Sequence, residues 1–486
     1  MLPIKQFCNF RFGQTYMKTF YKIAIAIIIY AMLSIPDPYN PLPIKDVEES
    51  STISKWWGKY AQNLVKYRII NNASRAYYYD LHRSMLNQKL DNMELELTEP
   101  DSPMLDSISY HINKLSALAS LVPNKINEFE GDVFRWRRLL KYQSRYWDIS
   151  SKSAGNRLYQ LMVESRLAFE SALVQSNYPT VAWSTAFADG GFQTKIVKSI
   201  TFQSGDILAF NLQRENNLGL SFRRDMPNAY DHLGSVYIQG TEAYVTYVDH
   251  ELGLQSYPLD TFVSSLAPNG MILRVRQDIQ PMIENPELPI MVAASLFGMA
   301  QEGKYKFDFR YDLETRNYLY DWEMLNNLFK KYDLTIGPEK IRFNTHTINL
   351  GPSKINHEPF EMEYDPKLIV AGEWYETKTL YDQRVLTAAT STLILSNNEA
   401  GFVNPWKLPM YRVIKAYSMI LNQFGANGPI PKGVSAQTHM VRVALVKQQK
   451  KALTELKKEL AKYESEQNHK ATYLKMLQSA KEINYE

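Results

Sequence analysis

The hydrophobic pattern of this chain changes from helical to β-rich after residue 180, and that change constrains the fold more than any other feature of the sequence. Between residues 52 and 174, apolar side chains recur at helical spacing, for example at Leu158, Leu161 and Met162. A period of about 3.6 residues predicts helices that bury one face. Few glycines interrupt this half, so we expect a helical bundle or hairpin.

Short β-rich runs replace the helical pattern between residues 195 and 276. Turn residues such as Ser204-Gly205 and Gln239-Gly240 separate them, which is typical of strands joined by tight turns. We therefore expect a small, mostly antiparallel sheet or half-barrel, and an α+β fold. The predicted strands are residues 196–202, 206–210, 234–238, 243–248 and 271–275.

Helical patterns return after the sheet region. The last of them, from residue 435 onward, reads as one long charged helix with an incomplete apolar stripe. Such a stripe indicates a solvated helix packed on one face, and a coiled coil or partner-binding arm is the alternative. The other predicted helices span residues 286–302, 320–332, 380–396 and 404–424.

The N-terminal segment has the pattern of a targeting sequence. Lys18 and Lys22 precede the apolar run of residues 23–33, and a proline-rich stretch follows. A basic start with a short apolar run is typical of a secretory signal, whereas a spanning helix needs about 20 apolar residues. An uncleaved anchor and a buried helix are the alternatives. We expect the body to lie outside the cytoplasm, in the periplasm or cell envelope, with membrane attachment through residues 20–35 if the segment is retained.

Charge and cysteine content exclude several function classes. The 486 residues carry a net charge of +4, which is too mild to predict nucleic-acid binding. The single cysteine, Cys8, excludes intramolecular disulfides and cysteine-based zinc sites. Cys8 also precedes the apolar run in the sequence, so the folded body that follows has no thiol and cannot carry out thiol chemistry. No histidine pair has metal-motif spacing, and we predict no metal and no cofactor.

Four short motifs follow one another between residues 200 and 330. They are Ser204-Gly205-Asp206-Ile207, Tyr230-Asp231-His232-Leu233-Gly234, Gly303-Lys304-Tyr305-Lys306-Phe307-Asp308-Phe309 and Tyr318-Leu319-Tyr320-Asp321-Trp322-Glu323. Their order resembles that of the permuted papain-like amidases of the YaeF/YiiX type. In that family a Gly-Asp strand and a His-x-Gly strand come first, and a Tyr-Cys-Ser-Glu stretch later places the nucleophilic cysteine at a helix start.

The resemblance implies a role for each matched residue. His232 matches the base, Glu323 matches the glutamate after the nucleophile, and Asp321 stands at the nucleophile position. A cysteine there would have its thiolate stabilised by the helix N-terminus and by histidine. For the third group, which orients the imidazole, Asp249 is preferred over Thr246.

Several neighbours of these residues are candidate binding positions. They are Asp206, Tyr305, Tyr320 and the bulky Trp322, which replaces the serine of the family pattern. Asp321 also has a structural interpretation, because an aspartate at a helix start caps free N–H groups. A carboxylate can act as a nucleophile or activate water, but it is a poor substitute for a thiolate in attack on an amide.

These observations predict a catalytically inactive permuted papain-like amidase homologue. Its cleft would bind an envelope ligand or partner, for which a peptide, a cell-wall fragment or an acyl chain are the candidates. One alternative is an active amidase or esterase that uses His232 with Asp321 or Glu323. Another is an envelope scaffold protein that works through its helical regions, with a protein partner on the C-terminal helix.

The expected fold is a papain-like permuted core, a small antiparallel sheet with a packed helix, flanked by helical N-terminal and C-terminal extensions. The expected segments are a signal peptide or anchor at 1–35, a proline-rich linker at 36–51, a helical region at 52–180, a papain-like domain at 195–380, a helical extension at 381–434 and a charged helix at 435–486.

Overall fold

The computed structural model divides into two compact units. One unit comprises Met1–Pro43 and Ile394–Gln448, and the other comprises Ile44–Leu393 and Gln449–Glu486. The linker predicted at 36–51 lies, apart from Pro36, outside the described residues. The structure describes residues 5–36, 52–184, 192–212, 221–223, 230–249, 252–308, 318–337, 347–349, 359–396, 404–423, 428–430 and 434–483.

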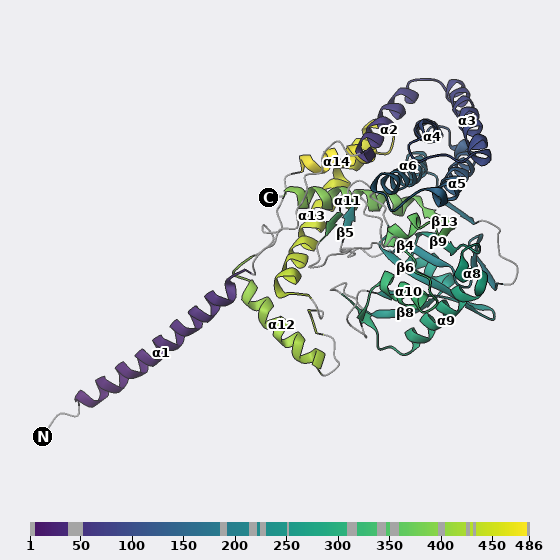
Figure 1. Cartoon of the computed structure of the whole chain (residues 1–486). Helices are drawn as coiled ribbons and strands as arrows, with labels where there is room; N and C mark the ends of the chain where they lie inside the picture. The colour runs from purple at the N-terminus through teal and green to yellow at the C-terminus, as the bar shows by residue number, and fades with distance from the viewer. Residues whose placement is uncertain are drawn as a thin grey trace. The chain divides into compact units, whose positions relative to one another are not determined.

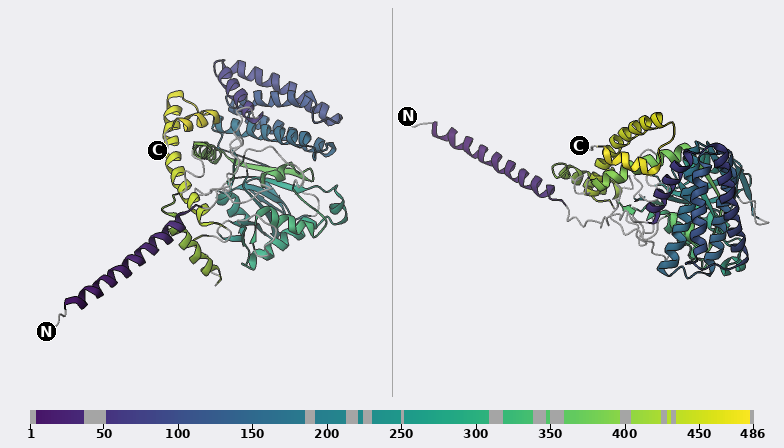
Figure 2. Two further views of the ribbon diagram at one scale, coloured as in Figure 1. Left: turned by 60° about the vertical axis from the view of Figure 1, so that its left-hand side comes forward. Right: turned by 90° about the horizontal axis from the view of Figure 1, so that it is seen from above.

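The larger unit begins with helices, as the period of its apolar residues predicts (Figure 1). Their starts carry the expected N-caps, since Asn71, Ser102 and Ser151 each accept a hydrogen bond from a backbone N–H of the first turn. Figure 2 shows these helices lying side by side. They are α2 (Thr52–Arg68), α3 (Asn72–Leu95), α4 (Pro103–Ala119), α5 (Ile126–Gln143) and α6 (Lys152–Ser176).

The C-terminal part of the chain returns to this helical core. Leu456 and Leu460 are buried in it, and the ring of Tyr473 lies 5.0 Å from that of Trp57. The single tail helix that we predicted is wrong, because Asn468 has a left-handed φ of 54° and ends the regular backbone. The helices concerned are α11 (Thr377–Ser396), α13 (Ala436–Gln467, of which residues from 449 onward belong here) and α14 (Tyr473–Glu482).

A seven-stranded antiparallel sheet forms the rest of the larger unit, so the predicted α+β class is confirmed. Its strand order is β1-β13-β9-β4-β6-β7-β8. Its neighbouring strands pair antiparallel throughout the described residues. The strands are β1 (Thr180–Ser184), β4 (Ile207–Asn211), β6 (His232–Gln239), β7 (Glu242–Asp249), β8 (Gly253–Pro258), β9 (Asn269–Val275) and β13 (Leu368–Glu376).

Alternation along the strands gives the sheet two apolar faces. Ile207 and Leu233 contribute to a cluster with helices α9 (Leu288–Gln301) and α10 (Asp321–Lys330). Leu208 contributes to a second cluster, which includes residues of the hairpin β2–β3 and of the turn of π-helix at Phe262–Leu266. Both faces are therefore covered, which explains why β4 is buried at every position.

The sheet is larger than the sequence predicts. Three strands were missed, namely β1, β8 and β13, because none of them alternates clearly between apolar and polar residues; β1 and β8 are also short, whereas β13 has nine residues. The run at 196–202 is not one strand but the hairpin of β2 (Thr194–Val197) and β3 (Ile200–Gln203). Lys198 and Ser199 make its turn with φ values of 48° and 66°, which is the conformation of a tight hairpin.

The remaining described elements are short. The helical segments are Pro123–Lys125, Ser144–Tyr146, α7 (Leu259–Thr261), α8 (Gln280–Glu284) and Pro359–Tyr364. The strand pairs are β10 (Lys306–Phe307) with β11 (Tyr318–Leu319), and β5 (Ser221–Arg223) with β12 (Thr347–Asn349).

A buried network of charges joins the helices to the sheet within this unit. Arg137 on α5 donates to Glu363 (2.5 Å) and to Glu373 on β13, and Arg166 on α6 donates to Glu363 (3.1 Å). All four side chains are at most 3% exposed. Removing one partner of such a pair leaves an uncompensated buried charge, so the network fixes how α5 and α6 meet β13.

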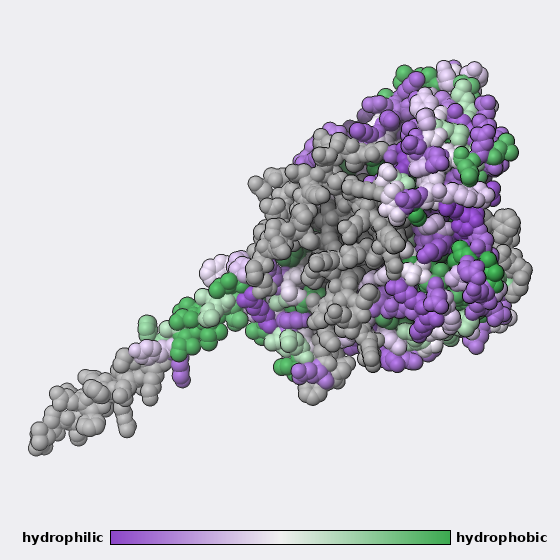
Figure 3. All heavy atoms as spheres, in the orientation of Figure 1, coloured by the Kyte–Doolittle hydropathy of each residue, from purple (hydrophilic) through white to green (hydrophobic). Residues whose placement is uncertain are grey.

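The smaller unit contains α1 (Lys5–Ser34), α12 (Leu408–Gln423) and the start of α13. Tyr30 donates a hydrogen bond to the carbonyl of Trp406, and Arg412 donates to that of Leu33 (2.9 Å). Figure 3 shows hydrophobic side chains gathered along the described part of α1, where Ile27 is 63% exposed. Within the described ranges, no helix has both the length and the hydropathy needed to cross a bilayer.

Candidate functional site

His232 is the first residue of β6 and is completely buried. The antiparallel register places it opposite Phe210 of β4, and the two rings stack with centroids 5.7 Å apart. Tyr247 of β7 meets the imidazole edge-on at 6.0 Å. Aromatic packing on two sides holds the imidazole plane in one orientation.

Asp321 is the first residue of α10 and lies against the imidazole of His232. Its Oδ2 accepts hydrogen bonds from Nδ1 of His232 (3.1 Å) and from the backbone N–H of Leu233 (3.2 Å). Its Oδ1 accepts one from the backbone N–H of Val248 (3.1 Å). Tyr320 precedes the helix in extended conformation. One carboxylate therefore ties the N-terminus of α10 to strands β6 and β7.

The electrostatics of the site favour a charged imidazole. Burial lowers the pKa of His232, but the carboxylates of Asp231, Asp321 and Asp249 outweigh burial and raise that pKa to about 9. His232 is therefore protonated at neutral pH and donates from Nδ1 to Asp321. The pair is a buried imidazolium–carboxylate ion pair.

Asp231 brings a second carboxylate to the imidazole; it lies in the motif that contains His232 but was not among the predicted site residues. Its Oδ1 lies 3.9 Å from Nε2 of His232, and its side chain is 26% exposed. Burial of the rest raises the pKa of Asp231 to about 6, while the charge of His232 opposes that rise. Asp231 is thus the partly solvent-exposed residue beside the buried ion pair. Its position next to His232 in sequence was the one signal that could have identified it.

The two candidates for the orienting group have other partners. Asp249, at the end of β7, accepts from the hydroxyl of Tyr247 (3.4 Å) and from the backbone N–H of Leu252 (3.0 Å). Thr246 is bonded to the hydroxyl of Ser256 (2.6 Å). Asp249 acts on His232 through its charge, whereas the hydrogen bond that orients the ring comes from Asp321.

The carboxylate of Asp206 pairs with a buried arginine and does not face a binding site. Arg274 of β9 donates to it through Nε (2.6 Å) and Nη2 (3.1 Å), and Asp206 also accepts from the backbone N–H of Gln203 (2.7 Å). The pair is buried. Gly205, just before it, has φ of +93°, and a Cβ there would lie 2.6 Å from the side chain of Pro289 on α9. The Gly-Asp motif therefore packs α9 against the sheet.

The other predicted binding residues are mostly buried around the start of α10. Trp322 is 4% exposed, stacks with Tyr320 at 6.3 Å, and donates from Nε1 to the carbonyl of Ile336 (3.2 Å). Glu323 is buried and accepts from Asn327 (3.4 Å). Tyr320, Trp322 and Glu323 thus lie beside Asp321, and Tyr320 and Trp322 belong to the apolar core.

Tyr305 belongs to a different neighbourhood. Its carbonyl accepts from the backbone N–H of Leu254 on β8 (3.1 Å), and Lys304 lies 5.2 Å from its ring. Tyr305 packs at the edge of the same apolar cluster as α10. In the part of the chain that the structure describes, no group of three or more histidine, cysteine, aspartate or glutamate side chains could hold a metal ion.

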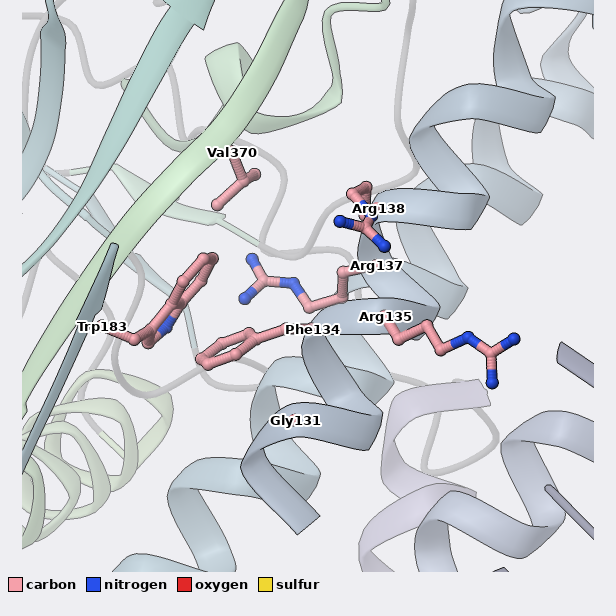
Figure 4. Close-up of a pocket in the computed structure, with 7 residues that line it drawn as sticks. All are labelled: Gly131, Phe134, Arg135, Arg137, Arg138, Trp183 and Val370. Carbon is pink, nitrogen blue, oxygen red and sulfur yellow. The ribbon is translucent and has the colours of Figure 1, made fainter. Parts of the chain in front are cut away.

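A small pocket of about 190 Å³ lies between α5, the edge strand β1 and its neighbour β13. Figure 4 shows the rings of Phe134 and Trp183 next to each other at its wall, with Arg135 directed away from Trp183; the ring centroids lie 3.4 Å apart. Arg137 lines the pocket, but its guanidinium is engaged by Glu363 and Glu373. This pocket is therefore walled by packing residues and lies apart from the His232–Asp321 pair in sequence and in sheet order.

The His232–Asp321 pair is a buried ion pair, but neither residue is well placed to attack a substrate or to accept a proton from it. A nucleophile must present a free lone pair to the substrate, and Asp321 has both oxygens engaged and is 5% exposed. A general base must be unprotonated at the working pH, and His232 is not. No family model, curated protein or solved structure matches this chain.

Proposed function

We propose that this protein is a non-catalytic relative of the permuted papain-like amidases, in which a carboxylate stands in for the catalytic thiolate. The observation that carries the proposal is the 3.1 Å hydrogen bond between Nδ1 of His232, at the start of a strand, and Oδ2 of Asp321, at the start of a helix. Papain-like sites bring a histidine and a cysteine together in this way, at a helix N-terminus.

The charges of the two pairs are equivalent, which explains how a papain-like arrangement would remain stable after the loss of its cysteine. A thiolate–imidazolium pair carries one negative and one positive charge, and so does the Asp321–His232 pair. Both anions are favoured by the partial positive charge of a helix N-terminus. The substitution would therefore keep the electrostatics of the site while removing its nucleophile.

Two features favour a binding role over the alternative of an active hydrolase. The carboxylate of Asp321 accepts three hydrogen bonds, and the raised pKa keeps His232 protonated. In our proposal the partly exposed carboxylate of Asp231 accepts an N–H from the ligand. Amine or amide donors of that kind occur in peptides and in peptide-bearing cell-wall fragments.

The proposed location is the periplasm or cell envelope. Its support is the apolar character of residues 23–33, whose described side chains in α1 lie largely exposed. An exposed apolar helix is costly in water and is favoured at a lipid surface or in the export machinery. Fusion of alkaline phosphatase after residue 52 should give an active enzyme if the body is exported, and an inactive one if it is not.

The decisive experiment is the substitution Asp321→Cys in a Cys8→Ser background, so that the introduced thiol is the only one. A thiol at that position, beside His232 and at the helix start, should have a pKa below the usual value of about 8.5. We expect fast alkylation by iodoacetamide at pH 6 and acylation by p-nitrophenyl acetate. The wild-type protein should turn over neither esters nor peptide amides.

The controls separate the frame from the thiol itself. Adding His232→Gln to the Asp321→Cys variant should return the thiol to ordinary reactivity, and Ser84→Cys, at an exposed position in the middle of α3, should give an ordinary exposed thiol. If the introduced thiol at position 321 alkylates no faster than that control, the papain-like frame is wrong. If the wild-type protein hydrolyses an ester and Asp321→Asn abolishes that turnover, the non-catalytic proposal is wrong.

A further inference from the structure

A polar cleft in the helical part of the larger unit is remote in sequence from the His232–Asp321 pair. It has a volume of about 570 Å³ and is lined by residues of α2, α4 and α6. Sites for small molecules commonly have volumes of about 300–1,000 Å³. The cleft is therefore large enough for a ligand of one or two sugar rings, and its lining indicates which chemistry it would recognise.

Positive charge dominates the mouth of the cleft. Lys55 and Lys59 are exposed neighbours on α2, four residues apart, and neither has an ion-pair partner among the described residues. Lysines at this spacing repel each other. The acidic residue on the same rim, Asp106, is held by Arg157 (2.6 Å). The rim thus presents two lysines without a salt bridge in the described part of the chain, and the charge of Lys59 also acts on Glu164 of the inner wall, whose pKa it lowers against the effect of burial.

A third lysine lies deeper in the cleft. Lys114 on α4 donates to Oδ1 of Asn63 (2.7 Å), and burial together with the charge of Lys66 lowers its pKa. Its ammonium also lies 5.3 Å from the ring of Tyr110. A ligand anion would relieve this repulsion, since an opposite charge favours the protonated lysine.

The inner wall supplies polar groups of other kinds. Glu164 is buried, and its carboxylate accepts from Ser109 and from Gln160 (2.9 Å). Burial raises the pKa of Glu164. The indole N–H of Trp56, a residue that lines the cleft and is 3% exposed, has no hydrogen-bond partner within the described ranges. A buried donor without a partner is costly, and a ligand acceptor would satisfy it.

We propose that this cleft binds an acidic sugar, meaning a mono- or disaccharide that carries a carboxylate or a phosphate. Lys55 and Lys59 would bind the acidic group. Glu164 would accept from sugar hydroxyls, and the exposed ring of Tyr110 (53% exposed) would pack on the sugar face. A neutral sugar would leave the lysines unpaired, and a bare anion would leave the hydroxyl-binding wall unused. The site goes beyond the function proposed above and shares no residue with it.

Titration calorimetry on the full chain tests the proposal with four probes. D-glucuronate and glucose 6-phosphate carry both required groups, glucose carries only hydroxyls, and inorganic phosphate carries only charge. We expect at least one acidic sugar to bind about ten-fold or more tightly than both glucose and phosphate, since charge-assisted hydrogen bonds contribute this much. The two acidic sugars distinguish a carboxylate-bearing ligand from a phosphate-bearing one.

Matched charge variants assign the binding to this cleft. Lys55→Gln/Lys59→Gln should weaken binding of the acidic sugar by about ten-fold or more. Lys458→Gln/Lys462→Gln removes two exposed lysines at the same spacing on α13 and should leave binding unchanged. The proposal is overturned if no acidic sugar binds, if phosphate alone binds as well as glucose 6-phosphate, or if both double variants behave alike.

Discussion

A single carboxylate, that of Asp321, holds together the region that the sequence motifs singled out. It accepts from the imidazole of His232 and from two backbone N–H groups on neighbouring strands. Buried acceptors engaged in this way contribute by satisfying donors that water can no longer reach. The same residue is therefore an N-terminal helix anchor and one half of a buried ion pair.

Replacing Asp321 by asparagine should destabilise the larger unit. Asp321→Asn removes the carboxylate that is hydrogen-bonded to the buried imidazolium of His232 and leaves it the more distant Asp231 (3.9 Å), so we expect the free energy of unfolding to fall by about 3 kcal/mol. Urea unfolding followed by circular dichroism measures the change. The exposed Asp101→Asn, with the same chemical change, should cost less than about 0.5 kcal/mol. A loss below about 1 kcal/mol at Asp321 would contradict the ion pair.

The pKa of His232 predicts a pH dependence of known sign. Because the folded-state pKa is raised to about 9 from 6.5, protonation stabilises the fold fully below pH 6.5, and this contribution is lost as the pH rises through 9. We expect the stability difference between wild type and His232→Gln to shrink by about 3 kcal/mol over that range.

Measuring that difference, rather than wild type alone, isolates the imidazole. Lys141 is buried with its pKa lowered to about 8, and it acts in the opposite direction, gaining stability as the pH rises, in both proteins. Urea midpoints at pH 6, 7, 8 and 9.5 would give the curve. A difference that does not change with pH would show that His232 is neutral in the folded protein.

At the scale of elements, the Gly-Asp motif positions a helix rather than a ligand. Gly205 lets the chain turn with positive φ directly against α9, and Asp206 then pairs with Arg274 of β9. The motif therefore sets the spacing between α9 and the sheet, and α10 packs beside α9 on the same face. In this way a turn before β4 helps to place Asp321.

Gly205→Ala should be more destabilising than a loss of backbone freedom alone explains. The new Cβ would lie 2.6 Å from the side chain of Pro289 and 2.8 Å from its carbonyl carbon, so α9 must shift. Gly240 is the matched control, since it also has positive φ (63°) but has open space around the Cβ position. We expect a cost of about 1 kcal/mol at Gly240 and at least about 2 kcal/mol at Gly205. Thermal unfolding of both variants measures this, and equal losses would contradict the packing argument.

At the scale of the whole molecule, the two units differ in how they bury apolar surface. The larger one has three clusters of buried residues spread over its helices and sheet. The smaller one leaves large apolar side chains exposed on α1 and α12, among them Ile25, Ile28, Met410 and Ile420. Exposed apolar surface of this extent marks a place where a protein contacts lipid or another protein.

Deleting residues 1–43 should separate the contact of α1 with lipid from the stability of the larger unit. The deletion removes the exposed apolar residues of α1, so co-sedimentation with lipid vesicles should fall strongly. The main thermal transition should stay within about 3 °C, because the core of the larger unit consists of its own residues. Substituting Ile25 and Ile28 by serine in the full chain is the milder control. Undiminished vesicle binding after the deletion would assign membrane contact to another segment.

Local patterns in the sequence were sufficient for the helical character of residues 52–174, for strands β4, β6, β7 and β9, and for the motifs that contain His232 and Asp321, but not for the separate helices α2 to α6. Such features depend on neighbours within a few residues, which periodicity and capping reveal. The match to the motif order was also sufficient to name two residues, 89 positions apart in the chain, that lie in hydrogen-bond contact.

Only the tertiary structure decided what those residues do. It engaged both oxygens of Asp321 with backbone donors, brought Asp231 to the imidazole, and buried Asp206 against Arg274. It also paired the edge strand β1 with β13, across almost 200 residues of sequence. Hydrogen bonding and charge in a buried site depend on groups far apart in sequence, and their energies depend on burial, which no local pattern records.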